Sequence, residues 1–136
     1  MTEPKIGWAG PAKKEMTPWG ETWTWSTPDT LVGKIIKIRA GNRTSLKYHR
    51  LKNKSFFVLQ GCVEITFGNS FTVSNTAENP YSTVVIVAGE TFSIQSECPY
   101  RIKSVDDSTI IEIGDRSRDT FVRLEDDYGR TSSGKD

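Results

Sequence analysis

The stretch GNRTSLKYHRLKNKSFFVLQG, residues 41–61, holds the one histidine of the chain, His49, between two bracketing glycines. Lys47 precedes His49 by two residues, and Lys54 follows it by five. Residues two apart on a strand point to the same face of a sheet, so Lys47 and His49 share a face. The stretch therefore predicts a pair of strands that place cations where a metal site would place its ligands.

Short segments with the period of a β-strand run through most of the chain around this stretch. ETWTWST, residues 21–27, alternates aromatic and polar side chains, which is typical of a half-buried strand. We expect further strands at residues 31–41, 44–51, 55–61, 62–69, 71–75, 82–89, 91–95, 100–105 and 108–115. Gly, Pro, Asn and Asp separate them, which favours an antiparallel sandwich or barrel. Residues 74–82 read as a surface loop, and a short helical turn fits only after Arg118.

Composition restricts the classes of function. The 136 residues fit one domain, which we divide into an N-terminal arm (1–17), a barrel (18–130) and a flexible tail (131–136). A net charge of +1 gives no general attraction to nucleic acid or membranes, so neither is expected as a partner. The first residues lack an apolar signal core, and the two cysteines have no metal or redox spacing. We therefore expect a cytoplasmic protein with buried free thiols.

The spacing in residues 41–61 resembles the first motif of the cupin superfamily. That motif runs Gly, five residues, His, one residue, His, four residues, Glu, six residues, Gly. His49 matches its second histidine, whereas Lys47 takes the place of the first histidine and Lys54 that of the glutamate. In the second motif, starting at Gly89, Arg101 takes the place of the remaining ligand histidine. The resemblance implies an all-β fold, the antiparallel double-stranded β-helix or jelly-roll barrel.

Three further segments resemble the C-terminal cupin domain of type II mannose-6-phosphate isomerases. They are TPWGETW (17–23), AGNRTSLKYH (40–49) and DTFVRLEDDYGR (119–130), and they occur in the same order as in that family. The resemblance implies a protein that acts on a sugar phosphate or sugar nucleotide. Tyr128 and Arg130 in the closing segment match positions that the family retains near its active site, and we expect them, with Lys54, to bind the ligand. The alternative is a terminal segment that docks on the barrel, with Asp126 and Asp127 as solvated charges.

The metal positions depart from the family. An ammonium or a guanidinium has no lone pair to offer a metal at neutral pH, so only His49 keeps a ligating side chain. We expect no metal and no other cofactor. In a cupin the face shared by Lys47 and His49 is the barrel interior, where Lys54 and Arg101 would join them. Unpaired buried cations are costly.

Three outcomes remain open for these cations. They bind an anion such as phosphate, a carboxylate or a sugar phosphate; they extend into water at the barrel mouth; or they pair with inward-facing acids, for which Glu64 and Glu112 are candidates. The tryptophans Trp19, Trp23 and Trp25 are interpreted as core or subunit interface, with stacking on a sugar as the alternative.

Three functions follow from these alternatives. In an isomerase, His49 would be the base, while Lys47, Lys54 and Arg101 would stabilise an enediolate oxygen in place of a metal. In a non-catalytic cupin, the pocket would only bind a sugar or an anionic metabolite. In a structural module, the barrel would serve dimer formation. We expect a homodimer, in which the lead-in of residues 1–20 contributes to pairing.

Overall fold

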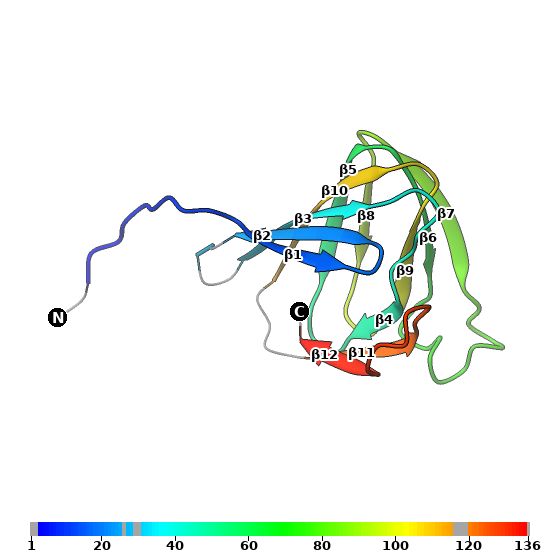
Figure 1. The fold of residues 1–136 in the computed structure, drawn as a ribbon. Helices are drawn as coiled ribbons and strands as arrows, with labels where there is room; N and C mark the ends of the chain where they lie inside the picture. The colour runs from blue at the N-terminus through cyan, green and yellow to red at the C-terminus, as the bar shows by residue number, and fades with distance from the viewer. Residues whose placement is uncertain (1–2, 26, 29–30, 116–119, 136) are drawn as a thin grey trace.

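Two six-stranded antiparallel sheets form the molecule in the computed structural model, which describes residues 3–25, 27–28, 31–115 and 120–135 (Figure 1). Sheet A has the order β1 (Lys13–Thr17), β2 (Gly20–Trp25), β3 (Leu31–Ile38), β10 (Ser108–Asp115), β5 (Lys54–Gln60), β8 (Thr91–Ile94). Sheet B has the order β12 (Ser133–Lys135), β11 (Thr120–Glu125), β4 (Leu46–His49), β9 (Tyr100–Ser104), β6 (Cys62–Phe67), β7 (Ser82–Val87). This arrangement confirms the predicted all-β jelly roll.

The core lies between the two sheets and follows the alternation of the strands. In sheet A, Ile36, Phe56 and Ile110 are buried, and the residues next to each of them along its strand face outward. Ile65 and Ile102 of sheet B meet them from the other side. The strands at the centre of the two sheets thus contribute every second side chain to the interior, which identifies their inward positions.

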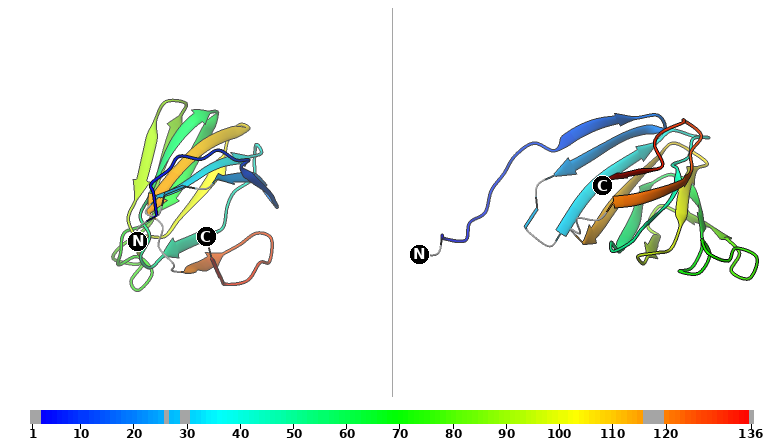
Figure 2. Two further views of the ribbon diagram at one scale, coloured as in Figure 1. Left: turned by 90° about the vertical axis from the view of Figure 1, so that its left-hand side faces the viewer. Right: turned by 90° about the horizontal axis from the view of Figure 1, so that it is seen from below.

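The two ends of the chain differ from the expected arm and tail. Residues 13–17 form β1, which pairs with β2, and residues 133–135 form β12, which pairs with β11. Every residue of β1 except Thr17 is exposed, so this strand lacks the alternation that marks the others in the sequence. Residues 3–12 project from the barrel without regular structure (Figures 1 and 2). Met1, Thr2 and Asp136 lie outside the described residues.

The strand expected at residues 71–75 is wrong, because this segment forms hydrogen-bonded turns. The backbone N–H of Asn75 donates to the carbonyl of Phe71 at 2.9 Å, a helix-like i to i+4 contact. The buried Thr72 hydroxyl accepts from the N–H of Asn69 at 2.8 Å. Such side-chain contacts of Asn and Thr compete with a sheet ladder. Residues 74–82 mostly form an exposed loop, as predicted, and strand β7 begins at Ser82.

The described part of the chain contains no helix, and therefore no helix able to cross a membrane. The segment after Arg118 is β11 from Thr120 onward rather than a helical turn, and residues 116–119 lie outside the described residues. Both Cys62 and Cys98 are free thiols, as expected, but they are half-buried rather than buried. Gly61, the second bracketing glycine, has φ = 100°, and a Cβ there would lie 2.6 Å from the carbonyl oxygen of Asp107. This turn therefore requires glycine.

Candidate functional site

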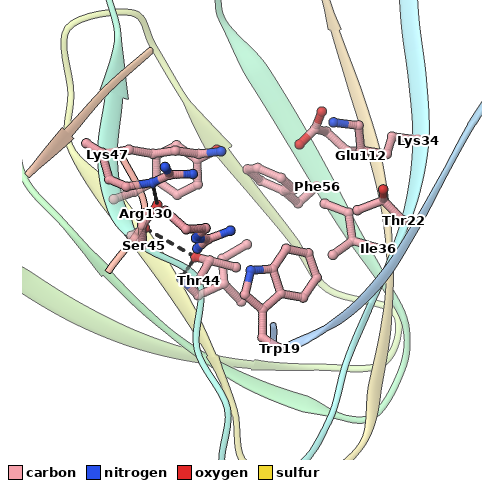
Figure 3. Close-up of a pocket in the computed structure, with 13 residues that line it drawn as sticks. Trp19, Thr22, Lys34, Ile36, Thr44, Ser45, Lys47, Phe56, Glu112 and Arg130 are labelled. Carbon is pink, nitrogen blue, oxygen red and sulfur yellow. Dashed lines mark hydrogen bonds between the residues drawn. The ribbon is translucent and has the colours of Figure 1, made fainter. Parts of the chain in front are cut away.

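A cavity of about 70 Å³ lies between the sheets at one end of the barrel and is partly open to solvent. One buried water needs about 10–15 Å³ on this scale, so the cavity has room for a ligand of several non-hydrogen atoms. Its lining residues are Trp19, Thr22, Lys34, Ile36, Thr44, Ser45, Lys47, Phe56, Tyr100, Ile102, Glu112, Arg123 and Arg130. Figure 3 shows Lys47, Ser45 and Arg130 on one side and Lys34, Thr22 and Glu112 across from them. The two sides are called the sheet B wall and the sheet A wall below.

The sheet B wall contains two cations that face each other directly. Lys47 of β4 is paired in register with Arg123 of β11. The ring of Phe121 lies beneath both, 4.4 Å from the Lys47 Nζ and 5.0 Å from the Arg123 Cζ. The Arg123 Nε donates to the Ser45 hydroxyl at 3.1 Å, which fixes its guanidinium. Like charges directly across an antiparallel pair are destabilising, and here they produce a positive electrostatic potential at the cavity.

Arg130 adds a third cation to this wall. Its guanidinium donates to both carboxylate oxygens of Asp126, with Nη2 to Oδ1 at 2.9 Å and Nε to Oδ2 at 3.1 Å. The hydrogen bonds from Arg130 lower the pKa of Asp126, so this carboxylate is ionised at neutral pH. Burial, and then the nearby charge of Arg130, lower the pKa of Arg123. The Asp126 shift thus reflects its pairing with Arg130, and the Arg123 shift mainly its burial.

The sheet A wall carries the carboxylate of the site. Glu112 of β10 lies between Lys34 of β3 and Phe56 of β5 in the register of the sheet. Its Oε1 is 3.4 Å from the Nζ of Lys54, and both side chains are almost fully buried. Lys54 therefore pairs with an inward-facing acid, the third of the outcomes left open by the sequence. The other candidate acid, Glu64, alternates with the buried Val63 and Ile65 and points outward.

Arg101 does not join the other cations, so its expected position inside the barrel is wrong. Its neighbours Tyr100 and Ile102 line the cavity, which turns Arg101 to the outer face of sheet B. There it is buried beneath the C-terminal segment, and its Nε donates to the carbonyl of Thr44 at 3.1 Å. Its Nη1 donates to Glu125 at 3.4 Å. Burial lowers the pKa of Arg101, an effect partly offset by nearby acids.

His49 and Tyr128 also lie outside the cavity lining. His49 is buried, and its ring meets Phe121 edge-on with centroids 5.7 Å apart, so it lies beside the ring that carries the two cations and not at the cavity itself. The Tyr128 hydroxyl donates to Asn42 or to the carbonyl of Arg43, both at 3.3 Å, which holds the closing segment on the barrel. The proposed roles of these residues stay predictions, but neither contacts the cavity directly.

Sequence reasoning missed Lys34 and Arg123. The period of β3 gives the signal for Lys34, because it shares its face with the buried Ile36 and Ile38. Arg123 likewise shares its face with the buried Phe121. Trp19 belongs to the core cluster, as predicted, and also lines the cavity.

The arrangement of the two sheets is that of a cupin-fold protein. Solved structures that resemble the chain are oxalate decarboxylase from Bacillus subtilis (TM-score 0.67, 11% identity, 91% of this chain and 30% of that chain) and from Lactobacillus farciminis (TM-score 0.66, 16% identity, 91% and 33%). KdgF from Halomonas sp. resembles it over 80% of this chain and 88% of that chain, with a TM-score of 0.64 and 14% identity. No protein-family model and no curated protein matches the chain. The chain spans about a third of the decarboxylase chains, and at these identities the likeness concerns the fold.

A metal centre, such as the Mn(II) centres described for the Bacillus subtilis oxalate decarboxylase, does not fit the corresponding residues here. Lys54 is paired with Glu112, Arg101 faces outward, and Lys47 presents an ammonium to the cavity. In the part of the chain that the structure describes, no three His, Cys, Asp or Glu side chains gather into a metal-binding group. The chemistry of this donor set instead suits an anion.

Proposed function

We propose that this chain is a mannose-6-phosphate isomerase-like cupin that binds a phosphorylated sugar in the cavity, through cationic side chains and without a metal. The observation that carries the proposal is the cross-strand pair of Lys47 and Arg123 over Phe121. Two cations held face to face at a cavity are stabilised when an anion lies between them. Arg123 can contact a phosphate with two N–H groups, and Lys47 adds a point charge.

The charge balance of the cavity supports the same ligand class. Four cations line it, Lys34 and Lys47 together with Arg123 and Arg130, against the single carboxylate of Glu112 among the described lining residues. A phosphomonoester carries up to two negative charges at pH 7, which suits a lining in which cationic side chains outnumber carboxylates among the described residues.

The segments that resemble the isomerase family also support the proposal. Residues 17–23, 40–49 and 119–130 together supply seven of the thirteen lining residues: Trp19, Thr22, Thr44, Ser45, Lys47, Arg123 and Arg130. Three segments distant in sequence thus converge on one cavity. Asp119, the first residue of the closing segment, lies outside the described residues.

Isothermal titration calorimetry with mannose 6-phosphate, mannose and inorganic phosphate tests this proposal. We expect mannose 6-phosphate to bind, mannose to bind far more weakly, and Lys47→Met to raise the Kd for mannose 6-phosphate about tenfold or more, the loss of one charge-assisted contact. Lys37→Met is the matched control, because Lys37 is exposed and lies on the outer face of sheet A. Equal losses in the two variants, or no binding by the wild-type protein, contradict the proposal.

Turnover is a separate measurement on the same protein. Conversion of mannose 6-phosphate to fructose 6-phosphate without added metal would make the chain an isomerase, whereas binding without conversion supports the alternative of a non-catalytic carbohydrate-binding cupin. GDP-mannose as a competitor tests a sugar nucleotide in the same assay. Turnover that requires a divalent metal would contradict the metal-free site.

We also propose that the chain forms a homodimer through the outer face of sheet A. This face exposes a band of large apolar side chains: Trp25, Leu31, Phe57, Leu59 and Ile113. Residues 3–12 lead away from their own barrel with Ile6 and Trp8 exposed, which suits contact with a second copy (Figure 2). Light scattering tests this: we expect the mass of a dimer for the wild-type protein and of a monomer for Ile113→Glu. A monomeric wild-type protein contradicts it.

A further inference from the structure

We propose that Arg43 is a positioning residue for the cavity: its ion pair with Asp127 holds the loop between β11 and β12 so that Arg130 reaches the ligand. This inference rests on the proposed sugar-phosphate site. It goes further, because it assigns the readiness of that site to an exposed ion pair whose two members do not line the cavity. The feature that carries it is a loop that supplies a cation to the cavity but is attached to the barrel by side chains.

Arg43 lies on a fixed part of the barrel. Backbone hydrogen bonds of 2.8, 3.0 and 2.9 Å join residues 41–44 to Ser104 and Ile102 of β9. Backbone that is bonded to a central strand in this way opens less readily than a surface loop. Arg43 therefore offers a firm point of attachment to whatever its side chain contacts.

The loop that faces Arg43 is held differently. It joins β11 to β12, which form a hairpin at one edge of sheet B (Figure 1). Among the described residues, no backbone-to-backbone hydrogen bond links residues 126–131 to the barrel. Arg43 instead donates to both carboxylate oxygens of Asp127, with Nε to Oδ2 at 2.6 Å and Nη2 to Oδ1 at 2.8 Å. The Tyr128 hydroxyl lies 3.3 Å from the Arg43 carbonyl oxygen. Arg43 thus contacts the loop at two successive residues.

Asp127 is connected to the cavity through its two neighbours in the chain. Asp126 precedes it and accepts hydrogen bonds from Arg130 at 2.9 and 3.1 Å. Tyr128 follows it, and the Arg130 guanidinium lies 5.4 Å from the centre of its ring. From this arrangement Arg130 reaches the cavity (Figure 3). A movement of Asp127 away from Arg43 therefore displaces both groups that orient Arg130.

The strength of the ion pair suits the control of a loop rather than of the whole fold. The side chains of Arg43 and Asp127 are each 41% exposed, and exposed pairs contribute little to global stability. The forked geometry places this pair at the upper end of that range. Arg101 also attracts Asp127, but its Nη2 is 3.9 Å from Oδ1 and has no hydrogen bond among the described residues. It therefore does not replace the two donors of Arg43.

Calorimetry with mannose 6-phosphate tests this role in variants of the pair. The apparent affinity falls with the fraction of protein in the binding arrangement, so we expect Arg43→Met and Asp127→Asn each to raise the Kd about threefold. The ceiling is about fivefold, which corresponds to about 1 kcal/mol, the most that an exposed pair contributes. The double variant should lose no more than either single variant, because both remove the same interaction.

Two further variants serve as controls. Arg43→Lys keeps the charge but not the fork, so its Kd should lie between those of the wild-type protein and Arg43→Met. Lys103 is exposed and faces Arg43 across an isolated bridge, so Lys103→Met removes the same charge beside it. We expect the Kd of Lys103→Met to stay within about 1.5-fold of the wild-type value, because exposed charges at this distance from the ligand are screened.

Two readouts separate positioning from a general structural role. If Arg43 acts through Arg130, Arg43→Met should cause no further loss of affinity in an Arg130→Gln background. Limited trypsin digestion, with cleavage after Arg130 followed by mass spectrometry, measures loop opening without relying on the ligand. We expect this cleavage to be about threefold faster in Arg43→Met, and slower when mannose 6-phosphate is present.

The possible failures are distinguishable. Equal Kd values for Arg43→Met and Lys103→Met, or an undiminished effect of Arg43→Met in the Arg130→Gln background, overturn the inference while the anion site stands. Absence of mannose 6-phosphate binding by the wild-type protein overturns the proposed function, and the positioning role with it. In that case the trypsin result still shows whether Arg43 holds the loop.

Discussion

Replacement of Lys54 by methionine should destabilise the protein strongly, because it leaves the Glu112 carboxylate buried without its partner. The two side chains are 1% and 4% exposed, and the Nζ–Oε1 distance is 3.4 Å. Breaking a buried ion pair on one side costs about 3–5 kcal/mol. Since Glu112 also faces the cavity, water there can hydrate part of the carboxylate, and we expect the lower end, about 3 kcal/mol. For a domain of this length that corresponds to a fall in Tm of about 10 °C.

Urea unfolding followed by fluorescence of the four tryptophans measures this loss. The double variant Lys54→Met/Glu112→Gln should recover at least about 2 kcal/mol relative to Lys54→Met, because both members of the Lys54–Glu112 pair are then neutral. Lys13→Met is the matched control: the Lys13–Glu15 pair is shorter, at 3.1 Å, but exposed, so its removal should not change the unfolding midpoint measurably. A loss below about 1 kcal/mol in Lys54→Met, or additive losses in the double variant, would refute the reasoning.

Three other perturbations have defined outcomes. Gly20→Ala should cost about 2–3 kcal/mol in urea unfolding, since its Cβ would overlap the carbonyl oxygen of Lys37, while Gly10→Ala meets no atom within 4 Å and should be neutral. The lowered pKa of Asp126 means that its ion pair stabilises the fold above the ordinary carboxyl pKa and is lost as the pH falls through the lowered value. The stability gap between wild type and Asp126→Asn should therefore shrink as the pH falls below the ordinary carboxyl pKa of about 3.9, and a gap independent of pH would contradict this. Mannose 6-phosphate should bind more weakly in about 0.5 M than in about 0.05 M NaCl, with a smaller change in Lys47→Met; calorimetry at the two concentrations decides.

The sequence predicts the fold and part of the site because alternation marks the inward face of each long strand. Lys47 and His49 are two residues apart on β4, so both side chains point to the inner face of sheet B. Glu112 is two residues from Ile110 on β10 and likewise points inward, where it pairs with Lys54. Glu112 could be placed from the pattern of β10, whereas Lys47 and His49 were placed inside through the resemblance to the cupin motif, because their apolar neighbours Leu46 and Tyr48 point to the other face.

Arg101 could not be placed by motif spacing, because the motif aligns residue numbers and not the pleat of the strand. The alternation in YRIKS instead puts Tyr100 and Ile102 on the buried side and Arg101 on the other, which is what the structure has. The strand β1 was missed for a different reason: its five residues bury no face, and only their pairing with β2 makes them a strand. That pairing depends on tertiary context, which local pattern does not report.

The irregularity in the pairing of β11 with β4 determines which charges reach the cavity. Arg123 pairs with Lys47, but the next paired residues are Glu125 and Leu46, so β11 carries one extra residue at this point. In a regular ladder Glu125 would follow Arg123 inward, and its carboxylate would cancel the field at the mouth of the barrel. The bulge sends Glu125 outward to Arg101 instead. A single extra residue in β11 thus keeps one carboxylate out of the cavity. With the same side chains and an unbroken ladder, the cavity would attract anions less strongly.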